Sequence, residues 1–435
     1  MPRILFVSLH GSPHTARWVE CVADSGLDLH MFGIDAGPPN SLLRGVTLHV
    51  PAPPRPQGPG PLTRVRRFAG LALRDTAEAS RRILRRLRQR PLPLPPPGAV
   101  RVVEMPAAAP QPADARIPFG DTGADYPATH GPAMLADLVV RLKPDLIHSM
   151  EFQHCGYLVL AARDILGADN FPPWLATNWG SDIYLFGREP AHAAMIRRLL
   201  AAADLYSCEC HRDITLAREM GFTGPDLPVL PNSGGLDLAR IAPLRSPMPP
   251  SRRKTIMIKG YDHFAGRAMV SLAVLERFAD RLRGHEIVMF SAGARPRVRA
   301  LELREQGVLN IRVIDWATHE DILAEFGRAR MYMGISLSDA ISTSVLESMA
   351  MGAFPIQTNT SCCEEWFEDG VGGFAVPPDN FEVICGRFER ALTDDALVDN
   401  AALVNRAVVE ARLDTRVVQP QVRNFYAQAF GHLAR

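Results

Sequence analysis

The chain has 435 residues, of which 47% are hydrophobic and 22% are charged, and its 48 lysines and arginines nearly balance its 47 aspartates and glutamates. This composition is typical of a soluble globular protein, and a formal net charge of +1 argues against a function based on the charge of the whole chain. The length is too great for one ordinary hydrophobic core and predicts two domains.

The seven cysteines show no spacing that is typical of a metal site. Cys208 and Cys210 are two positions apart, Cys362 and Cys363 are adjacent, and the sequence contains no C-x-x-C pair. Neither spacing is that of zinc ligands. We therefore expect free thiols in a reducing cytoplasm.

The N-terminal segment predicts a strand, a glycine turn, a helix and a second strand. The buried-strand pattern RILFVSL at 3–9 leads to Gly11, a helical stretch begins near His14, and the second strand is expected at 27–35. This order opens a doubly wound α/β domain, in which a glycine lets the backbone approach a ligand. The apolar run is too short for a signal peptide, and the sequence predicts no transmembrane helix.

The segment 51–112 interrupts this pattern and is expected to be an insertion. Its proline-rich parts cannot form an interior helix or a central strand. Between them, 62–90 contains ten arginines with apolar residues interleaved. Two interpretations remain open: a solvated surface helix, or adhesion of Arg64–Arg90 to an anionic membrane surface, where each basic residue contributes about 1 kcal/mol. Nucleic-acid binding has no supporting motif.

The rest of the first domain, up to residue 241, alternates strands with helices. Strands are expected at 144–150, 174–178, 203–210 and 228–237. The carboxyl ends of parallel strands meet at one edge of a sheet, so polar residues that follow them gather there. The polar residues concerned are Glu151, His154, Ser181 and Asp182.

A linker rich in proline and charge, 242–254, leads to a second alternating pattern at 255–415. Strands are expected at 255–260, 285–293, 310–316, 331–338 and 353–358, with a helix at 268–282. Lys259 ends the first of these strands at a glycine turn, and Arg267 follows a further glycine. A final helical stretch lies at 417–433.

The stretch 333–379 carries the strongest functional pattern. Asp339 follows a buried strand, and the N-cap residue types at 342–344 precede a short apolar helix at 345–351 that contains Glu347. A helix N-terminus at this edge of a sheet favours a phosphate. Carboxylates beside a phosphate site repel the phosphate, so their natural partners are neutral hydroxyl groups. A sugar diphosphate nucleotide has hydroxyls on both sides of its phosphates.

This pattern resembles the donor-binding signature of retaining GT-B glycosyltransferases of family 4, the glycosyl transferases group 1. The resemblance rests on Asp339-Ala-Ile-Ser-Thr-Ser-Val-Leu-Glu347, followed by Phe354-Pro355-Ile356, Asp369-Gly370, Gly373 and Val376-Pro377-Pro378. It implies two doubly wound Rossmann-like α/β domains, 1–241 and 255–415, that face a cleft. The last segment, 416–435, would then cross back onto the first domain.

The resemblance also implies roles for individual residues. Asp339, which stands where the family usually has glutamate, would contact the transferred sugar, and Glu347 would bind the ribose. The sugar and diphosphate would be bound by Ile341, Ser342, Thr343 and Ser344. Lys259 and Arg267 would stabilise the leaving diphosphate. Gly11 would face the phosphates, and Trp316 would lie at the nucleotide base.

On the acceptor side, the resemblance implies His14, Glu151, His154, Ser181 and Asp182. The Gly180-Ser181-Asp182 run matches an acceptor-side loop of the family. Met150 stands where the family often has a histidine, and His154 is the candidate substitute for it.

The expected reaction is retaining transfer of a glycosyl group from a nucleoside diphosphate sugar to a hydroxyl of a saccharide or lipid-linked saccharide. The expected setting is cell-envelope, exopolysaccharide or glycolipid synthesis at the inner face of the plasma membrane. The sequence has no D-x-D motif, and lysine, arginine and a helix terminus can neutralise the diphosphate, so we expect no metal or other cofactor. Two alternatives remain open: a catalytically silent GT-B subunit that binds a partner or a sugar nucleotide, and a sugar-nucleotide epimerase of the same architecture.

Overall fold

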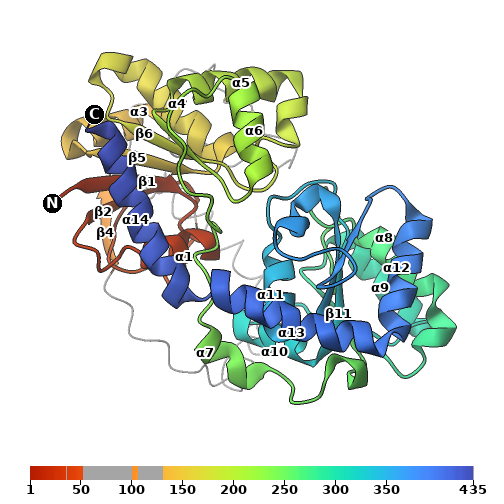
Figure 1. Cartoon of the computed structure of the whole chain (residues 1–435). Coiled ribbons are helices and arrows are strands. Elements are labelled where there is room, and N and C mark those ends of the chain that lie inside the picture. The colour runs from red at the N-terminus through yellow and green to blue at the C-terminus, as the bar shows by residue number, and fades with distance from the viewer. Residues whose placement is uncertain (36, 52–99, 106–130, 435) are drawn as a thin grey trace, which may run out of the picture.

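The computed structural model describes residues 1–35, 37–51, 100–105 and 131–434, and these form two α/β domains, each built on one parallel sheet (Figure 1). The expected fold class is therefore confirmed. The arginine-rich stretch 62–90, for which we expect a surface helix or a membrane contact, lies outside the described residues.

The first sheet has the strand order β4-β3-β2-β1-β5-β6-β7, and all its pairs are parallel. Its strands are β1 (Arg3–Ser8), β2 (Asp28–Gly33), β3 (Thr47–Pro51), β4 (Arg101–Met105), β5 (Leu146–Met150), β6 (Trp174–Thr177) and β7 (Leu205–Ser207). The central strand β1 is buried on both faces, which explains its continuous apolar run.

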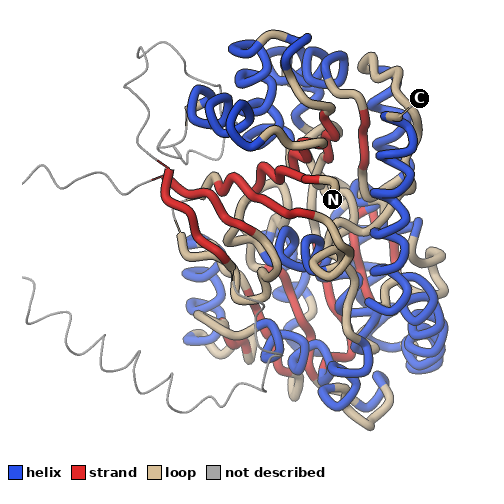
Figure 2. Tube along the Cα trace, turned by 90° about the vertical axis from the view of Figure 1, so that its left-hand side faces the viewer, coloured by secondary structure: helices blue, strands red, loops and turns tan. Residues whose placement is uncertain are grey.

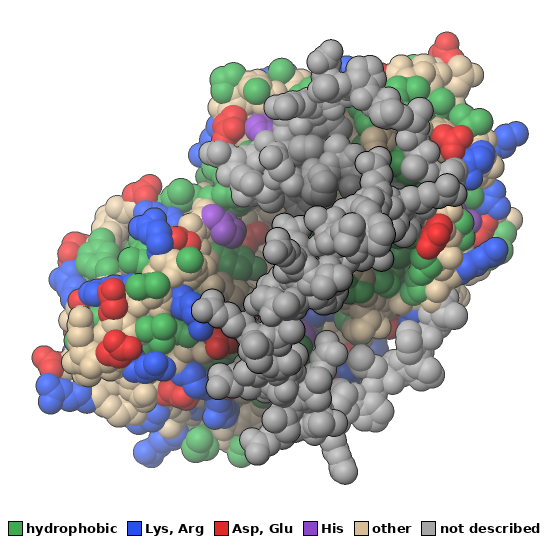
Figure 3. All heavy atoms as spheres, turned by 180° about the vertical axis from the view of Figure 1, so that it is seen from behind, with side chains coloured by type: hydrophobic (Ala, Val, Ile, Leu, Met, Phe, Trp, Pro, Cys, Tyr) green, Lys and Arg blue, Asp and Glu red, His purple; other side chains and the backbone are tan. Residues whose placement is uncertain are grey.

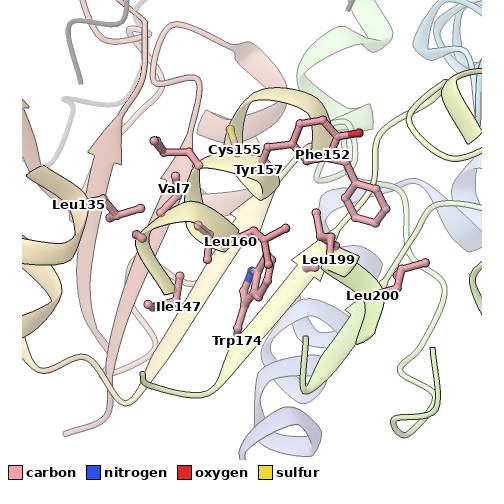
Figure 4. Close-up of a cluster of buried hydrophobic side chains, with 14 of the residues drawn as sticks. Val7, Leu135, Ile147, Phe152, Cys155, Tyr157, Leu160, Trp174, Leu199 and Leu200 are labelled. Atoms are coloured by element: carbon pink, nitrogen blue, oxygen red, sulfur yellow. The ribbon is translucent and has the colours of Figure 1, made fainter. Parts of the chain in front are cut away.

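Helices cover both faces of this sheet, as the tube in Figure 2 shows. They are α1 (Pro13–Glu20), α3 (Pro132–Leu142), α4 (Tyr157–Leu166), α5 (Pro190–Ala202) and α6 (His211–Glu219), with a short α7 (Leu238–Ile241) after them. Leu5 and Val7 of β1 pack with α3, α4 and α5 on one face, and Figure 4 shows Leu160 of α4 beside Trp174 of β6 in that core. Ile4 and Phe6 point to the other face. Alternate residues of one strand thus hold two helix layers.

The second domain repeats the plan with the strand order β10-β9-β8-β11-β12-β13. Its strands are β8 (Thr255–Lys259), β9 (Glu286–Phe290), β10 (Ile311–Val313), β11 (Ala329–Gly334), β12 (Phe354–Thr358) and β13 (Phe374–Val376). Its helices are α8 (Ala268–Arg277), α9 (Ala294–Glu305), α10 (His319–Arg328), α11 (Thr343–Met351), α12 (Phe381–Thr393) and α13 (Asp395–Arg412).

The last helix, α14 (Thr415–Leu433), leaves the second domain and lies on the first (Figure 1). Its apolar side chains, including Val422 and Phe425, pack with Ile4 and Phe6 of β1. The Tyr426 hydroxyl lies 2.8 Å from Trp18 Nε1 and 2.8 Å from His148 Nδ1. An indole N–H can only donate, so the hydroxyl accepts from Trp18 and donates to His148, whose pKa burial lowers to about 3.

Two expectations about strands are wrong. Residues 101–105 were expected within the irregular insertion, but they form β4, which extends the sheet by pairing in parallel with β3. The segment 228–237 was expected to be a strand, but it forms none: single bridges at Asp226 and Leu236 and hydrogen bonds such as Asn232 N–H to Glu209 hold this part of the chain. Two prolines in the segment lack the N–H that a sheet needs, and Gly234 and Gly235 have φ of 71° and 83°.

The surface of the described part mixes charges of both signs. On the face in Figure 3, lysine and arginine side chains alternate with acidic ones over the second domain, and many form ion pairs, such as Arg312 with Glu286 and Glu325. Among the described helices, none combines the length and the apolar composition that a membrane span needs.

We predict that Tyr426→Phe destabilises the protein. The change leaves the buried Trp18 N–H and His148 Nδ1 without their shared hydroxyl, and each lost buried hydrogen bond costs about 1–3 kcal/mol. Urea unfolding should therefore show a lower free energy of unfolding. As a control, Tyr184→Phe, at a half-buried ring, should change it by less than about 0.5 kcal/mol. Equal stability of wild type and Tyr426→Phe would contradict this account of how α14 is held.

Candidate functional site

A cleft of about 530 Å³ lies where loops from both domains meet. The first domain lines it with Leu9, Pro13, His14, Arg17, Glu151, Gln153, His154, Trp179, Gly180, Ser181, Asp182, Phe186, Glu209 and Asn232. The second domain lines it with Lys259, Tyr261, Phe264, Ala265, Phe290, Ser291, His319, Ile322, Asp339, Ile341, Thr343, Ser344 and Glu347. Many of these residues follow the carboxyl ends of strands, so the two sheets direct their loops into one cleft.

Glu347 is the most enclosed acidic group at the second-domain wall, with a side chain only 8% exposed. Its Oε1 lies 2.6 Å from His319 Nε2, and Arg17 of the first domain reaches to 3.1 Å from the same imidazole nitrogen. Burial alone would raise the pKa of Glu347, but His319 and Arg17 outweigh it, so the pKa lies below its ordinary value. Glu347 is therefore a buried carboxylate that stays ionised at neutral pH.

The N-terminus of α11 opens into the same cleft. Ser342 is the N-cap, but its side chain makes no capping hydrogen bond, and Thr343 and Ser344 begin the helix beside the cleft. The first N–H groups of a helix and its dipole favour an anion. Lys259 adds a cation to this wall, with its ammonium 4.6 Å from the centre of the Tyr261 ring.

His14 faces this wall from α1. Burial lowers its pKa to about 4, and the charge of Arg17 lowers it further in the same direction. Its ring meets Trp179 edge to face at 5.7 Å between centroids. At neutral pH it is therefore a neutral imidazole, which can both donate and accept a hydrogen bond.

Asp339 lies at a contact between the two domains. A Cβ atom at Gly180, whose φ is 38°, would lie 2.9 Å from Asp339 Oδ1. Arg212 of the first domain donates to the backbone carbonyl of Asp339 at 3.1 Å. The glycine thus lets an acceptor-side loop reach the carboxylate.

Glu151 and Asp182 shape the opposite wall of the cleft. Glu151 has a φ of 88° and accepts hydrogen bonds from the backbone N–H groups of His154 and Cys155, which hold a π-helical turn at 152–156. Asp182 Oδ2 accepts from the N–H groups of Phe152 and Trp179. Burial and the neighbouring Glu151 raise the pKa of Asp182 well above its ordinary value. Both carboxyl groups thus fix the loops that line the cleft.

His154 Nδ1 lies 2.9 Å from Glu151 Oε1. Burial lowers the pKa of His154, but the Glu151 carboxylate more than offsets it, and the net pKa is raised. His154 therefore carries more positive charge near neutral pH than an ordinary histidine.

Two segments of the chain match models of known families. Residues 264–394 match the model described as Glycosyl transferases group 1, and residues 132–209 match the model described as Glycosyl transferase 4-like. Each of the two domains therefore contains a segment that matches a glycosyltransferase family model. The resemblance that the sequence carries is therefore confirmed, while retention at the anomeric carbon stays a prediction.

Solved structures share the fold at low sequence identity. Sucrose-phosphate synthase from Thermosynechococcus elongatus is 14% identical with a TM-score of 0.67, covering 99% of this chain and 100% of that one. Anabaena Alr3699/HepE in complex with UDP-glucose is 12% identical with a TM-score of 0.61, covering 98% and 100%. The lipopolysaccharide outer core galactosyltransferase WaaB is 10% identical with a TM-score of 0.57, covering 98% and 99%. No curated protein sequence matches the chain.

Most of the expected site residues line the GT-B cleft. On the donor side these are Lys259, Asp339, Ile341, Thr343, Ser344 and Glu347, and on the acceptor side His14, Glu151, His154, Ser181 and Asp182. They come together because the strands of the two parallel sheets end at facing edges, which brings loops that are far apart in the sequence to the same cleft.

Four expected donor-side residues do not line the cleft. Arg267 donates to the Pro378 carbonyl at 2.8 Å and to Asp379 at 3.2 Å, so its charge serves a loop of the second domain. Trp316 is 66% exposed. The Gly11 N–H donates to Asp35, and Ser342 is buried as the N-cap of α11.

The GT-B cleft also contains Arg17, Glu209 and His319, which sequence reasoning missed. Arg17 lies three residues, about one helical turn, after His14. The helix predicted to begin near His14 therefore puts both side chains on the same face. Thr318 and Asp321 form a capping box, a pattern that would have placed His319 at a helix start. Glu209 gave no signal, because it stands within an apolar segment expected to be a strand.

Glu209 is a partly buried carboxyl group whose Oε1 accepts from the Asn232 N–H at 2.8 Å. Burial and the charge of Asp339 raise its pKa to about 8. A neutral carboxyl group can donate a hydrogen bond, which a carboxylate cannot.

We predict that Glu209→Gln changes how stability depends on pH. The folded pKa of about 8 lies above the ordinary value of 4.5, so folding is most favoured below about pH 4.5, where both states are protonated. Between the two values only the unfolded glutamate ionises, so wild-type stability falls as pH rises. The melting temperature of Glu209→Gln relative to wild type should therefore rise from about pH 5 to about pH 8.

The exposed control Glu305→Gln should show a constant difference from wild type over the same pH range. A Glu209→Gln difference that is also independent of pH would contradict the raised pKa.

Proposed function

We propose that the protein transfers a glycosyl group from a nucleoside diphosphate sugar to a saccharide hydroxyl, with retention at the anomeric carbon. The observation that carries the proposal is the cleft in which Asp339 and Glu347 stand beside the N-terminus of α11 and Lys259. Two carboxylates, a helix terminus and a cation match the hydroxyls and phosphates of such a donor.

Each donor contact follows from the chemistry of its residue. The ionised Glu347 accepts hydrogen bonds from the ribose hydroxyls, since its low pKa keeps both oxygens available as acceptors. The backbone N–H groups at Thr343 and Ser344 bind the diphosphate. Asp339 accepts from hydroxyls of the transferred sugar and lies against the acceptor-side loop at Gly180.

The transfer step exchanges one bond for another at the anomeric carbon. The bond to the diphosphate oxygen breaks, the bond to the acceptor oxygen forms, and the departing phosphate takes the acceptor proton on the same face. Lys259 and the α11 terminus stabilise the charge that develops on the diphosphate, so we route no step through a metal. Positioning in the cleft supplies much of the rest of the catalysis.

The comparisons support this assignment. Both family models describe glycosyl transferases, and the structure of Alr3699/HepE with UDP-glucose shows that a GT-B protein of this shape accommodates such a donor. No specific feature of the cleft favours a catalytically silent subunit or an epimerase over a glycosyltransferase.

We further propose an acceptor of the cell envelope, reached at a membrane surface through 62–90. The arginines of this segment follow the β3 position of the acceptor domain in the sequence. We predict that neutralising Arg81, Arg82, Arg85 and Arg86 weakens co-sedimentation with anionic phospholipid vesicles, by about 1 kcal/mol for each charge lost at low salt. Unchanged binding of the variant would contradict the membrane role.

We predict that one nucleoside diphosphate sugar raises the melting temperature in a thermal-shift panel and that Glu347→Ala abolishes this response. Binding to the folded state alone stabilises it by mass action, about 2.7 kcal/mol at a hundredfold excess over Kd. Glu305→Ala, which removes an exposed glutamate, should keep the full shift. A shift that survives in Glu347→Ala would remove Glu347 from the donor site.

We predict that Lys259→Met lowers kcat by about 10²–10³-fold while the protein still binds the donor. The reason is that charge on the leaving diphosphate grows toward the transition state, where a fixed cation has its largest effect. Lys254→Met, at an exposed position five residues earlier, should keep wild-type kcat. Donor turnover measured by release of the nucleoside diphosphate tests this, and an unchanged kcat in Lys259→Met would refute the role.

A further inference from the structure

Two cysteines that are 152 positions apart meet at the interface between the domains. Cys210 lies between β7 and α6 of the first domain, and Cys362 follows β12 of the second. Their sulfur atoms are 3.2 Å apart. Cys210 is fully buried, and neither residue is among those that line the glycosyltransferase cleft.

A carboxylate completes the group. Glu365 lies three residues after Cys362, and one ligand atom from each of Cys210, Cys362 and Glu365 lies within 4.8 Å of the other two. Both oxygens of Glu365 are oriented by the first domain, since Oε1 accepts from the His211 N–H at 2.9 Å and Oε2 lies 3.0 Å from His211 Nδ1. A carboxylate oxygen with one such bond keeps a lone pair for a metal, and hydrogen bonds of this kind orient metal ligands.

The sulfur separation fits a shared ion better than a covalent bond. Two thiolates on a tetrahedral Zn²⁺, each about 2.3 Å from the ion, stand about 3.8 Å apart, whereas a disulfide needs about 2.05 Å. The observed 3.2 Å must therefore open by about 0.6 Å for the ion but close by about 1.2 Å for the disulfide.

We propose that Cys210, Cys362 and Glu365 bind a thiophilic divalent cation, with Zn²⁺ as the expected ion and a water in the fourth position. Binding replaces two thiol protons: one Zn²⁺, two thiols and one carboxylate give a complex of charge −1 and two released protons. The guanidinium of Arg212, which donates to the Asp339 carbonyl at the same interface and pairs with Asp213, adds positive charge near the group. Because its ligands come from both domains, the ion fastens the domains together beside the cleft.

The test uses Co²⁺ as a spectroscopic probe on the reduced, chelator-treated full chain. We expect about one Co²⁺ per chain, with thiolate-to-cobalt charge-transfer absorption and the visible bands of tetrahedral cobalt, both removed by added Zn²⁺. Cys362→Ser should abolish the charge-transfer absorption. His211→Ala, which removes only the imidazole that orients Glu365, should weaken Co²⁺ binding by about 10–100-fold.

Cys363→Ser is the matched control, since Cys363 is adjacent in sequence but outside the group, and it should keep the full cobalt spectrum. Melting curves without metal show whether each variant is folded. The proposal is overturned if wild type gives no charge-transfer band, if the band survives in Cys362→Ser, or if the reduced pair forms a disulfide in air and takes up no metal. None of these measurements uses a sugar nucleotide, so a failure of the metal proposal would not count against the proposed donor site, and the reverse also holds.

Discussion

The organisation of this protein depends on keeping one buried carboxylate charged. Glu347 lies on α11 with 8% of its side chain exposed, and such a group stays ionised only with positive partners nearby. Arg17 supplies a positive charge from α1 of the other domain, and the imidazole of His319 on α10 lies between it and Glu347, 2.6 Å from Glu347 Oε1. The charge that we propose for ribose binding therefore also links the two domains across the cleft.

The cleft as a whole brings several acidic side chains close to the place proposed for the diphosphate. Five of the described residues that line it are acidic: Glu151, Asp182, Glu209, Asp339 and Glu347. Their environments shift their pKa values in opposite directions: the pKa values of Asp182 and Glu209 are raised, and that of Glu347 is lowered. The raised pKa values of Asp182 and Glu209 reduce the negative charge that would repel the proposed diphosphate, while Arg17 and Lys259 supply positive charge.

The sequence was sufficient to predict the parallel sheets and the donor-side wall, because both follow from local patterns. The apolar run before Asp339 and the N-cap residues after it fixed the strand, the loop and α11, and these place Glu347 in the cleft. The placement of Arg267 and Trp316 could not be predicted in this way, since it depends on how the loops fold. Arg267 turns to the Pro378 carbonyl, and Trp316 points into solvent.

Contacts between the domains were equally hidden. Nothing near Cys210 or Cys362 in the sequence indicates that they meet, because the meeting depends on how two separately folded sheets are docked. The same holds for Glu209, whose pKa is raised by burial and by Asp339 from the other domain. Strand β4 is a different case: a proline-rich context masked a short edge strand that pairing with β3 stabilises.

The most direct test of the account is the configuration of the sugar that the enzyme first releases. A nucleoside diphosphate sugar with an α-linked sugar that the thermal-shift panel selects would be incubated with the protein and acceptor, and early product would be followed by proton NMR before the anomers equilibrate. Transfer within the closed cleft with retention predicts an α-linked product, lost in Asp339→Asn. A β-linked product, or transfer that persists in Asp339→Asn, would contradict the mechanism.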